Sequence, residues 1–162
     1  MAASSDTGRN ETEKERLDRN LNELLQELRV ALPGVQVLFA FLLTVPFQQR
    51  FEKATTFQKD VYGLTLLLTA LASALLMAPS AYHRLEFRRD DKRHIVYMAN
   101  RLSILGFAVL AAAMTSAILL VTDFLYGSTT AVIATVGAGV VLYGLWYLLP
   151  LARRAQRARQ EN

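Results

Sequence analysis

The polar side chains that could do chemistry in this 162-residue chain are few and lie beside long apolar segments. Glu27, Arg29 and Gln36 stand close together where the first apolar segment begins, and Asp123 stands between the third and fourth segments. An ion carrier uses ionisable groups in the membrane, where burial raises the free energy of a charge. Glu27, Arg29 and Gln36 therefore predict a polar vestibule that binds or gates an ion. The alternative is that Gln36 bonds to a neighbouring helix while Glu27 and Arg29 stay in water.

Asp123 has three interpretations. It is either part of an ion pathway or an interhelical polar contact, and a solvated carboxylate at a helix end is the simplest prediction for it. No acidic residue lies in the middle of an apolar segment. The ionisable residues that could bind an ion therefore lie only at the ends of the predicted spans.

Other catalytic chemistry has no candidate residues. The chain has no cysteine, and its two histidines, His83 and His94, do not have the spacing of a zinc site. No nucleophile triad, phosphate-binding loop or nucleotide fingerprint is present. We therefore expect no catalytic residue, no cofactor and no metal, and a protein that is not an enzyme. The net charge of +4 comes from loops and tails, so we expect no nucleic-acid partner.

The distribution of charge defines the elements that must position these residues. All charged residues fall outside four stretches, namely 30–47, 61–83, 102–122 and 124–152. About 20 apolar residues cross the hydrocarbon core of a bilayer as a helix. The sequence predicts an all-α, polytopic membrane protein, a four-transmembrane-helix bundle over residues 31–152. The expected spans are about 30–47, 61–82, 101–122 and 128–150.

The basic residues predict the orientation of these spans. All but three of the 18 Lys and Arg residues lie before the first span, between the second and third, or in the basic C-terminal tail, 153–162. By the positive-inside rule, both termini are cytoplasmic and the protein is a multi-pass protein of the plasma (inner) membrane. The expected lipid partners are anionic headgroups on that side. They would be met by Arg88, Arg89, Lys92 and Arg93.

The segment before the first span is predicted to be an amphipathic cytoplasmic helix over residues 11–30, after a disordered N-terminus, 1–10. Thr12 and Glu15 have the spacing of a capping box that begins such a helix. Its apolar stripe comprises Leu17, Leu21, Leu24 and Leu28. Residues 1–29 hold more acids than bases, so an anionic leaflet would not attract this helix. The stripe should pack on another helix, either of the same chain or of a second copy.

Two further patterns concern helix packing. Pro33 lacks a backbone N–H, so Pro33 and Gly34 predict a kink at the membrane entrance. Small residues at every fourth position predict close helix contacts in spans two to four. They are Ala70, Ala74 and Ala78, then Ala108, Ala112 and Ser116, then Ala131, Thr135 and Gly139. We therefore expect assembly with itself, as a homo-oligomer, or with a membrane-protein partner. The alternative is a monovalent-cation or proton transporter or channel.

Two segments carry a resemblance to a known family. They are RVALPGVQVLFAFLLTVPFQQRF, at residues 29–51, and YHRLEFRRDDKRH, at residues 82–94. With these segments the chain resembles a family of small four-span actinobacterial membrane proteins of unknown function, some of which are labelled sodium:proton antiporters. The resemblance implies the four-span plan and a plasma-membrane location. It assigns no functional residues.

Overall fold

The computed structural model describes residues 12–86 and 92–160, and the elements in this part of the chain are helices. The predicted all-α architecture is therefore confirmed. Two 3₁₀ turns connect the first two long helices, and a π-helical turn, η3, lies between α4 and α5. In chain order the elements are α1 (Glu13–Thr44), η1 (Val45–Phe47), η2 (Gln49–Lys53), α2 (Thr56–Glu86), α3 (Lys92–Tyr126), α4 (Ser128–Tyr143), η3 (Gly144–Leu148) and α5 (Leu149–Gln160).

Four helical segments are long and apolar enough to cross a membrane, which fits a multi-pass membrane protein. They are Glu15–Phe47, Thr56–Tyr82, Arg93–Tyr126 and Ser128–Arg153. Each predicted span lies within or largely within one of them. The helices extend further than the uncharged stretches, because a helix can continue into water once its apolar residues end. The number of spans expected from the distribution of charge is therefore confirmed.

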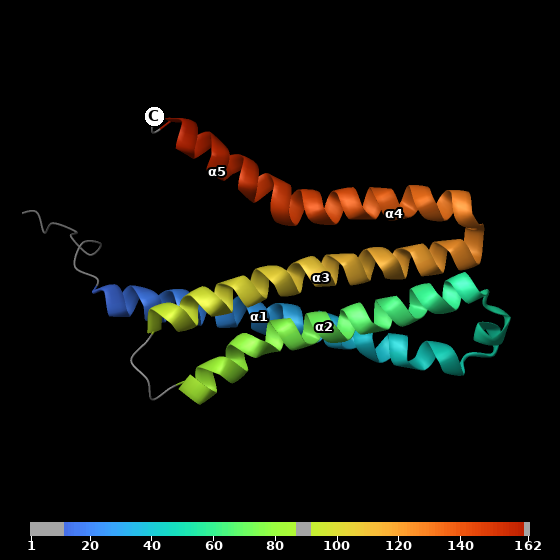
Figure 1. The fold of residues 1–162 in the computed structure, drawn as a ribbon, viewed down its shortest axis with the longest axis horizontal. Coiled ribbons are helices and arrows are strands. Elements are labelled where there is room, and N and C mark those ends of the chain that lie inside the picture. The colour runs from blue at the N-terminus through green and yellow to red at the C-terminus, as the bar shows by residue number, and fades with distance from the viewer. Residues whose placement is uncertain (1–11, 87–91, 161–162) are drawn as a thin grey trace, which may run out of the picture.

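The long helices run side by side, with the described ends of the chain at one end of the bundle (Figure 1). This end, where α2 ends and α3 begins, is called the terminal end below, and the opposite end is called the far end. α1, α2 and α3 pack against one another, whereas α4 packs on α3 alone among the long helices. The turn from α3 into α4 is a single glycine, Gly127, whose φ of 83° suits a residue without a Cβ. The structure is therefore a three-helix core with a fourth helix on one side.

The predicted leader and first span are one helix, α1. The Thr12 side chain accepts from the Glu15 backbone N–H, and the Glu15 carboxylate accepts from the Thr12 backbone N–H, so the capping box is confirmed. α1 continues past Pro33, which lies inside it. At 1.5 Å per residue, its 32 residues span about 48 Å. The helix is thus long enough to cross the hydrocarbon core and extend beyond it.

The leucine stripe of α1 packs inside the chain's own core. Leu21 and Leu28 are buried, Leu17 and Leu24 are half-buried, and the stripe continues into the membrane segment. Leu28 packs in a cluster with residues of all three core helices, namely Val35, Ala72, Leu76 and Leu110. Leu21 packs nearer the terminal end with Ile95 and Ala99. The sequence leaves open whether the leucine stripe packs on its own chain or on a second copy. In the structure, the stripe packs on its own chain.

The α2–α3 contact is built from small residues, but not from all those predicted. Ala72 on α2 and Ala111 on α3 are fully buried. Ala74, in the predicted ridge of span two, is exposed, so in this chain that ridge is not the fully buried face of α2. Thr65 and Thr69 occupy the face instead. Their hydroxyls donate to the Val61 and Thr65 carbonyls in the same helix. These hydrogen bonds lower the free energy needed to bury the two polar side chains.

Candidate functional site

The three residues of the predicted vestibule do not converge in this chain. Glu27, Arg29 and Gln36 are all exposed on α1. Glu27 and Gln36 lie nine residues apart on one continuous helix, which places them on opposite sides of it. Arg29 and Gln36 lie seven residues apart and therefore share a side. Within one bundle, the structure brings Arg29 and Gln36 to a common face and leaves Glu27 away from it.

This common face is a continuous row of exposed residues, which we call the α1 seam. Its positions alternate in spacing between four and three residues, the repeat that helices use when they pack along their length. The seam lies about a quarter-turn around α1 from the buried residues Leu28 and Val35. Its members are Arg29, Pro33, Gln36, Ala40, Leu43 and Phe47, all of them exposed.

Gln36 differs from the hydroxyl side chains deep in the spans. Those hydroxyls donate to backbone carbonyls, as Thr69 does to Thr65 and Thr135 to Ala131. Thr65 also forms a 2.7 Å hydrogen bond with Ser116 that joins α2 to α3. No hydrogen bond within the described part of the chain involves the Gln36 side chain. Since Gln36 lies seven residues beyond Arg29, its Cα is about 10 Å further along the helix axis.

Asp123 is an interhelical contact at the far end of the bundle. One carboxylate oxygen accepts from the Gln58 side-chain amide at 2.9 Å, and the other accepts from the Ser128 hydroxyl at 3.0 Å. Gln58 is only 9% exposed, and its amide oxygen accepts from the Thr55 backbone N–H. Asp123 thereby ties together the beginnings of α2 and α4 and the end of α3. The simplest prediction, a solvated carboxylate at a helix end, is therefore wrong for Asp123, which is an interhelical contact within this chain.

Sequence reasoning missed the partners of Asp123. Thr55 and Gln58 have the Thr-x-x-Gln spacing of a capping box, and Gln58 N–H also donates to the Thr55 hydroxyl. This local signal could have identified the start of α2. The contact of Gln58 with Asp123 has no such signal, because the two residues are 65 positions apart.

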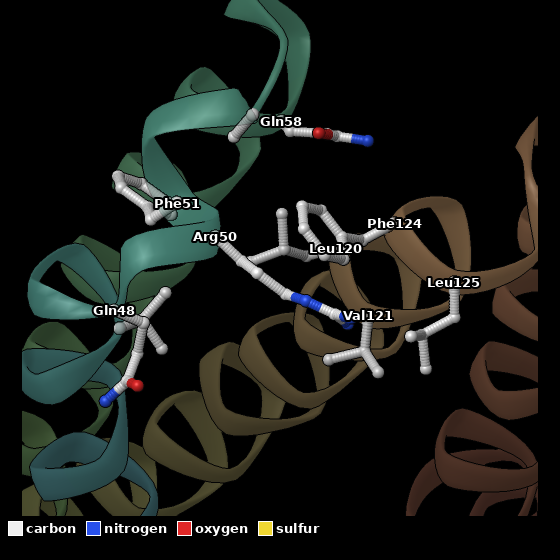
Figure 2. A pocket seen from close by; sticks show the side chains of 10 residues that line it. Gln48, Arg50, Phe51, Gln58, Leu120, Val121, Phe124 and Leu125 are labelled. Carbon is white, nitrogen blue, oxygen red and sulfur yellow. The ribbon is translucent and has the colours of Figure 1, made fainter.

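A cavity of about 230 Å³ lies beside this contact at the far end. Figure 2 shows the Arg50 side chain extending from the 3₁₀ segment toward Val121 on α3. Most other lining side chains are apolar, including Phe51, Leu120 and Phe124. The cavity has one basic side chain and no arrangement of acids and bases that would support proton transfer.

A second hollow of about 470 Å³ lies between α1 and Trp146 of η3, with α3 as its floor. Its lining is apolar and includes Gly34, Leu38, Phe107 and Trp146. The Phe107 and Trp146 rings meet edge to face with centroids 5.8 Å apart. The hollow exists because α4 contacts α3 but not α1.

Two tyrosines hold α4 and η3 to α3. The Tyr143 hydroxyl donates to the Ala108 carbonyl at 3.1 Å, and the Tyr147 hydroxyl donates to the Ile104 carbonyl at 2.6 Å. The four-residue step in each helix matches because the helices are antiparallel. These contacts involve the α3 backbone and so depend little on the identity of the α3 side chains.

The structure describes only some of the residues predicted to contact lipid headgroups. Arg88 and Arg89 lie outside the described residues, and Lys92 is the first residue of α3, with its side chain outside them. The Arg93 guanidinium bonds to the Glu13 carboxylate with Nε at 2.6 Å. This exposed contact joins the first turns of α1 and α3. Arg93 therefore has a partner within the chain, and its contact with lipid headgroups stays a prediction.

The titratable residues form no centre of the kind that metal chemistry needs. Within residues 12–86 and 92–160, no three or more acids and histidines gather where they could hold a metal ion. Among the described residues, the Gln36 amide lies within a membrane-spanning helix, is exposed, and has no hydrogen-bond partner in the chain.

The comparisons with known proteins give a family and no function. No curated protein and no solved structure matches the chain. Residues 10–150 match a family of unknown function, DUF6328, so the match covers the leader helix and all four spans. The resemblance seen in the sequence to an uncharacterised four-span family is thereby confirmed. The chain belongs to the DUF6328 family.

Proposed function

We propose that this is a non-catalytic plasma-membrane protein that acts by helix–helix assembly, and that a second copy docks along the α1 seam. The observation that supports this proposal is the exposed, unpartnered amide of Gln36 in a membrane-spanning helix. A glutamine amide has two donors and a carbonyl acceptor, and lipid tails offer no partner for any of them. A neighbouring helix can supply such partners, because polar side chains bond across helices in membranes.

The depth of Gln36 argues against a partner in water. It stands about 10 Å beyond Arg29 along α1, and Arg29 is the last charged residue before the uncharged stretch. A glutamine side chain is much shorter than this distance. The amide therefore stays in the hydrocarbon region, where an unsatisfied polar group costs several kcal/mol.

A second copy is the occupant that best complements this face. Two copies with the same orientation in the bilayer, related by a two-fold axis along its normal, place their Gln36 residues at equal depth. The two amides can then donate to each other's carbonyl oxygens. Ala40, one turn further along the seam, lets the helices approach closely. A single polar residue in an otherwise apolar seam also fixes register.

We propose the same orientation as the sequence predicts, with both termini cytoplasmic. Its support is the positive-inside rule, since nearly all Lys and Arg residues adjoin the terminal end. Arg29 then lies at the cytoplasmic surface of the seam. Like charges facing each other there would remain in water, where their repulsion is small.

The test is to measure self-association in lipid bilayers by energy transfer between labelled copies across a range of dilutions. We expect wild-type protein to form dimers, and Gln36→Leu to weaken them by about fivefold to thirtyfold, since it removes two interhelical hydrogen bonds that contribute up to about 1 kcal/mol each. Gln36→Asn keeps an amide and should retain much of the association. Gln49→Leu makes the same chemical change in the exposed 3₁₀ segment and serves as the matched control.

Disulfide trapping tests the geometry of the seam separately. The chain has no native cysteine, so one introduced cysteine reports one position. Ala40→Cys should give covalent dimers on oxidation in membranes, whereas Phe41→Cys, a quarter-turn away and also exposed, should give few. Wild-type protein that stays monomeric at all dilutions would refute self-assembly. Equal trapping at both positions would refute the seam.

A second candidate function is an ion pathway on the axis of an oligomer. The observation that favours it is that Arg29 and Gln36 share one face of α1, so three or more copies around that face would line an axis with both residues. Flux into vesicles under Na⁺, K⁺ and pH gradients tests it. We expect conduction to change with Gln36→Leu if the axis conducts, and null traces from well-incorporated protein would exclude this function.

A further inference from the structure

The last helix leaves the bundle at a defined point. Pro150 has no backbone N–H, so the preceding turn cannot complete its usual hydrogen bonds. The chain adopts the π-helical turn η3 there, in which Leu149 N–H donates to the Gly144 carbonyl. Beyond this turn α5 diverges from the axis of α4 (Figure 1). α5 contacts η3 and packs on no other described helix.

α5 has the composition of a helix that lies on a charged membrane surface. The segment Leu149–Gln160 contains four arginines and no acidic residue. Leu149, Leu151 and Ala155 are exposed in it. Leu151 and Ala155 are one turn apart and so share a face, and Arg153 lies about half a turn from Leu151. An interfacial helix combines such an apolar face with a basic one.

We propose that α5 docks on the surface of the bilayer that the bundle spans, and that its partner is the layer of anionic phospholipid headgroups. Two observations support this choice of partner. The charge of α5 is entirely positive, which complements an anionic leaflet, and α5 begins at Leu149, about one turn before the fourth apolar segment ends at Arg153. A helix turning away from the bundle at that depth meets headgroups before any other part of the chain.

The competing partner for α5 is the acidic leader. Glu23 and Glu27 are exposed on α1 at the terminal end, and the leader of a second copy could bind the arginines. Lipid dependence separates these possibilities, because binding to a leader would persist in an uncharged bilayer. This inference is independent of self-assembly through the α1 seam, since α5 and the seam share no residue.

The experiment labels α5 in the full-length protein. Ala155→Cys, which gives the chain its only cysteine, is coupled to a polarity-sensitive fluorophore and reconstituted into nanodiscs of phosphatidylcholine with or without phosphatidylglycerol. We expect a blue shift and quenching by brominated lipid only in discs that contain phosphatidylglycerol. About 1 M salt, which shortens the Debye length to about 3 Å, should reverse the shift.

Charge removal identifies the residues responsible. Each of Arg153→Gln and Arg157→Gln should lower the docked fraction relative to the undocked fraction about fivefold, and the two together should abolish the shift. Arg50→Gln with Lys53→Gln, in the segment at the far end of the bundle, is the matched control and should leave it unchanged. A shift equal in both lipids, or one that survives removal of the arginines, would overturn the proposal.

Discussion

The Tyr62 hydroxyl donates a 3.0 Å hydrogen bond to the Leu42 carbonyl, at the place where Pro46 leaves that carbonyl without its usual helical donor. Val45 N–H reaches the same oxygen in the tighter 3₁₀ manner as α1 ends. Tyr62 is buried, and its ring meets Phe51 edge to face. One side chain of α2 thus completes the hydrogen bonding of α1 and packs beneath the loop that joins the two helices.

Tyr62→Phe should therefore destabilise the far end of the bundle while keeping its packing. Removing the hydroxyl leaves the Leu42 carbonyl with one donor, at a cost of about 1 kcal/mol. Denaturation in mixed micelles, followed by circular dichroism, measures the change. Tyr126→Phe removes a hydroxyl from an exposed residue and should change stability little. Equal effects of the two substitutions would contradict the role given to Tyr62.

Gly106 lets α3 lie close to α2. A Cβ built at this position would lie 2.7 Å from Leu76 Cδ2 and 3.3 Å from Leu75 Cβ, so alanine does not fit without movement. Gly106→Ala should destabilise the fold by about 1–3 kcal/mol, the range for overpacked cores. Gly137→Ala, in open space on α4, should be neutral or stabilising because alanine favours a helix. Comparable thermal stability of the two variants would disprove the close contact.

Leu28→Ala should lower stability by about 2–5 kcal/mol, because Leu28 is 1% exposed within the three-helix cluster. The leucine stripe serves the fold of one chain, so this variant should lose monomer stability before it loses association. Val30→Ala, on a residue that is 79% exposed, is the control. Unfolding midpoints and dimer fractions should be measured on the same samples. Loss of dimers with unchanged unfolding would instead make the stripe an oligomer contact.

The Gln58–Asp123 bond should show energetic coupling. Gln58→Ala and Asp123→Ala each remove one partner of the 2.9 Å contact, so the double variant should cost less than the sum of the single variants. We expect a coupling energy of about 1–2 kcal/mol for this partly buried, charge-assisted bond. Asp60→Ala, at an exposed acid on α2, supplies the control cycle with Gln58→Ala and should show no coupling.

Replacing both tyrosines of α4 and η3 should loosen that helix selectively. Tyr143→Phe with Tyr147→Phe removes two hydrogen bonds to the α3 backbone while keeping both rings. Amide hydrogen exchange should rise in α4 and η3 and stay unchanged in α2, which packs on α1 and α3. A uniform rise along the chain would show that α4 is integral to the core.

The architecture could be predicted from sequence because it depends on a coarse physical quantity. Long stretches without charge require an apolar surrounding, and the Thr12–Glu15 pair marks the helix start by local hydrogen bonds alone. The packing faces were harder. A repeat of small or apolar residues indicates that a face meets something, but not which helix it meets. For this reason the repeat predicts Ala74 as a packing residue although it is exposed, and the sequence does not determine which helix Leu28 packs on.

The candidate site was predictable only in part for the same reason. Gln36 stands out in any sequence as an amide in an apolar segment. Whether Glu27 joins it depends on α1 remaining helical through Pro33, a point that local propensity does not decide. The divergence of α5 depends on hydrogen bonds that are lost at Pro150 and re-formed in a π turn. No residue pattern in the sequence predicts such a turn.

The continuity of α1 has a mechanical consequence. Thirty-two residues in one helix join the Glu13–Arg93 contact at the terminal end to the Tyr62 contact at the far end. A partner that pulls on the leader would act on the span directly, since α1 continues as one helix through Pro33. The membrane segment would thereby register an event that occurs outside the lipid.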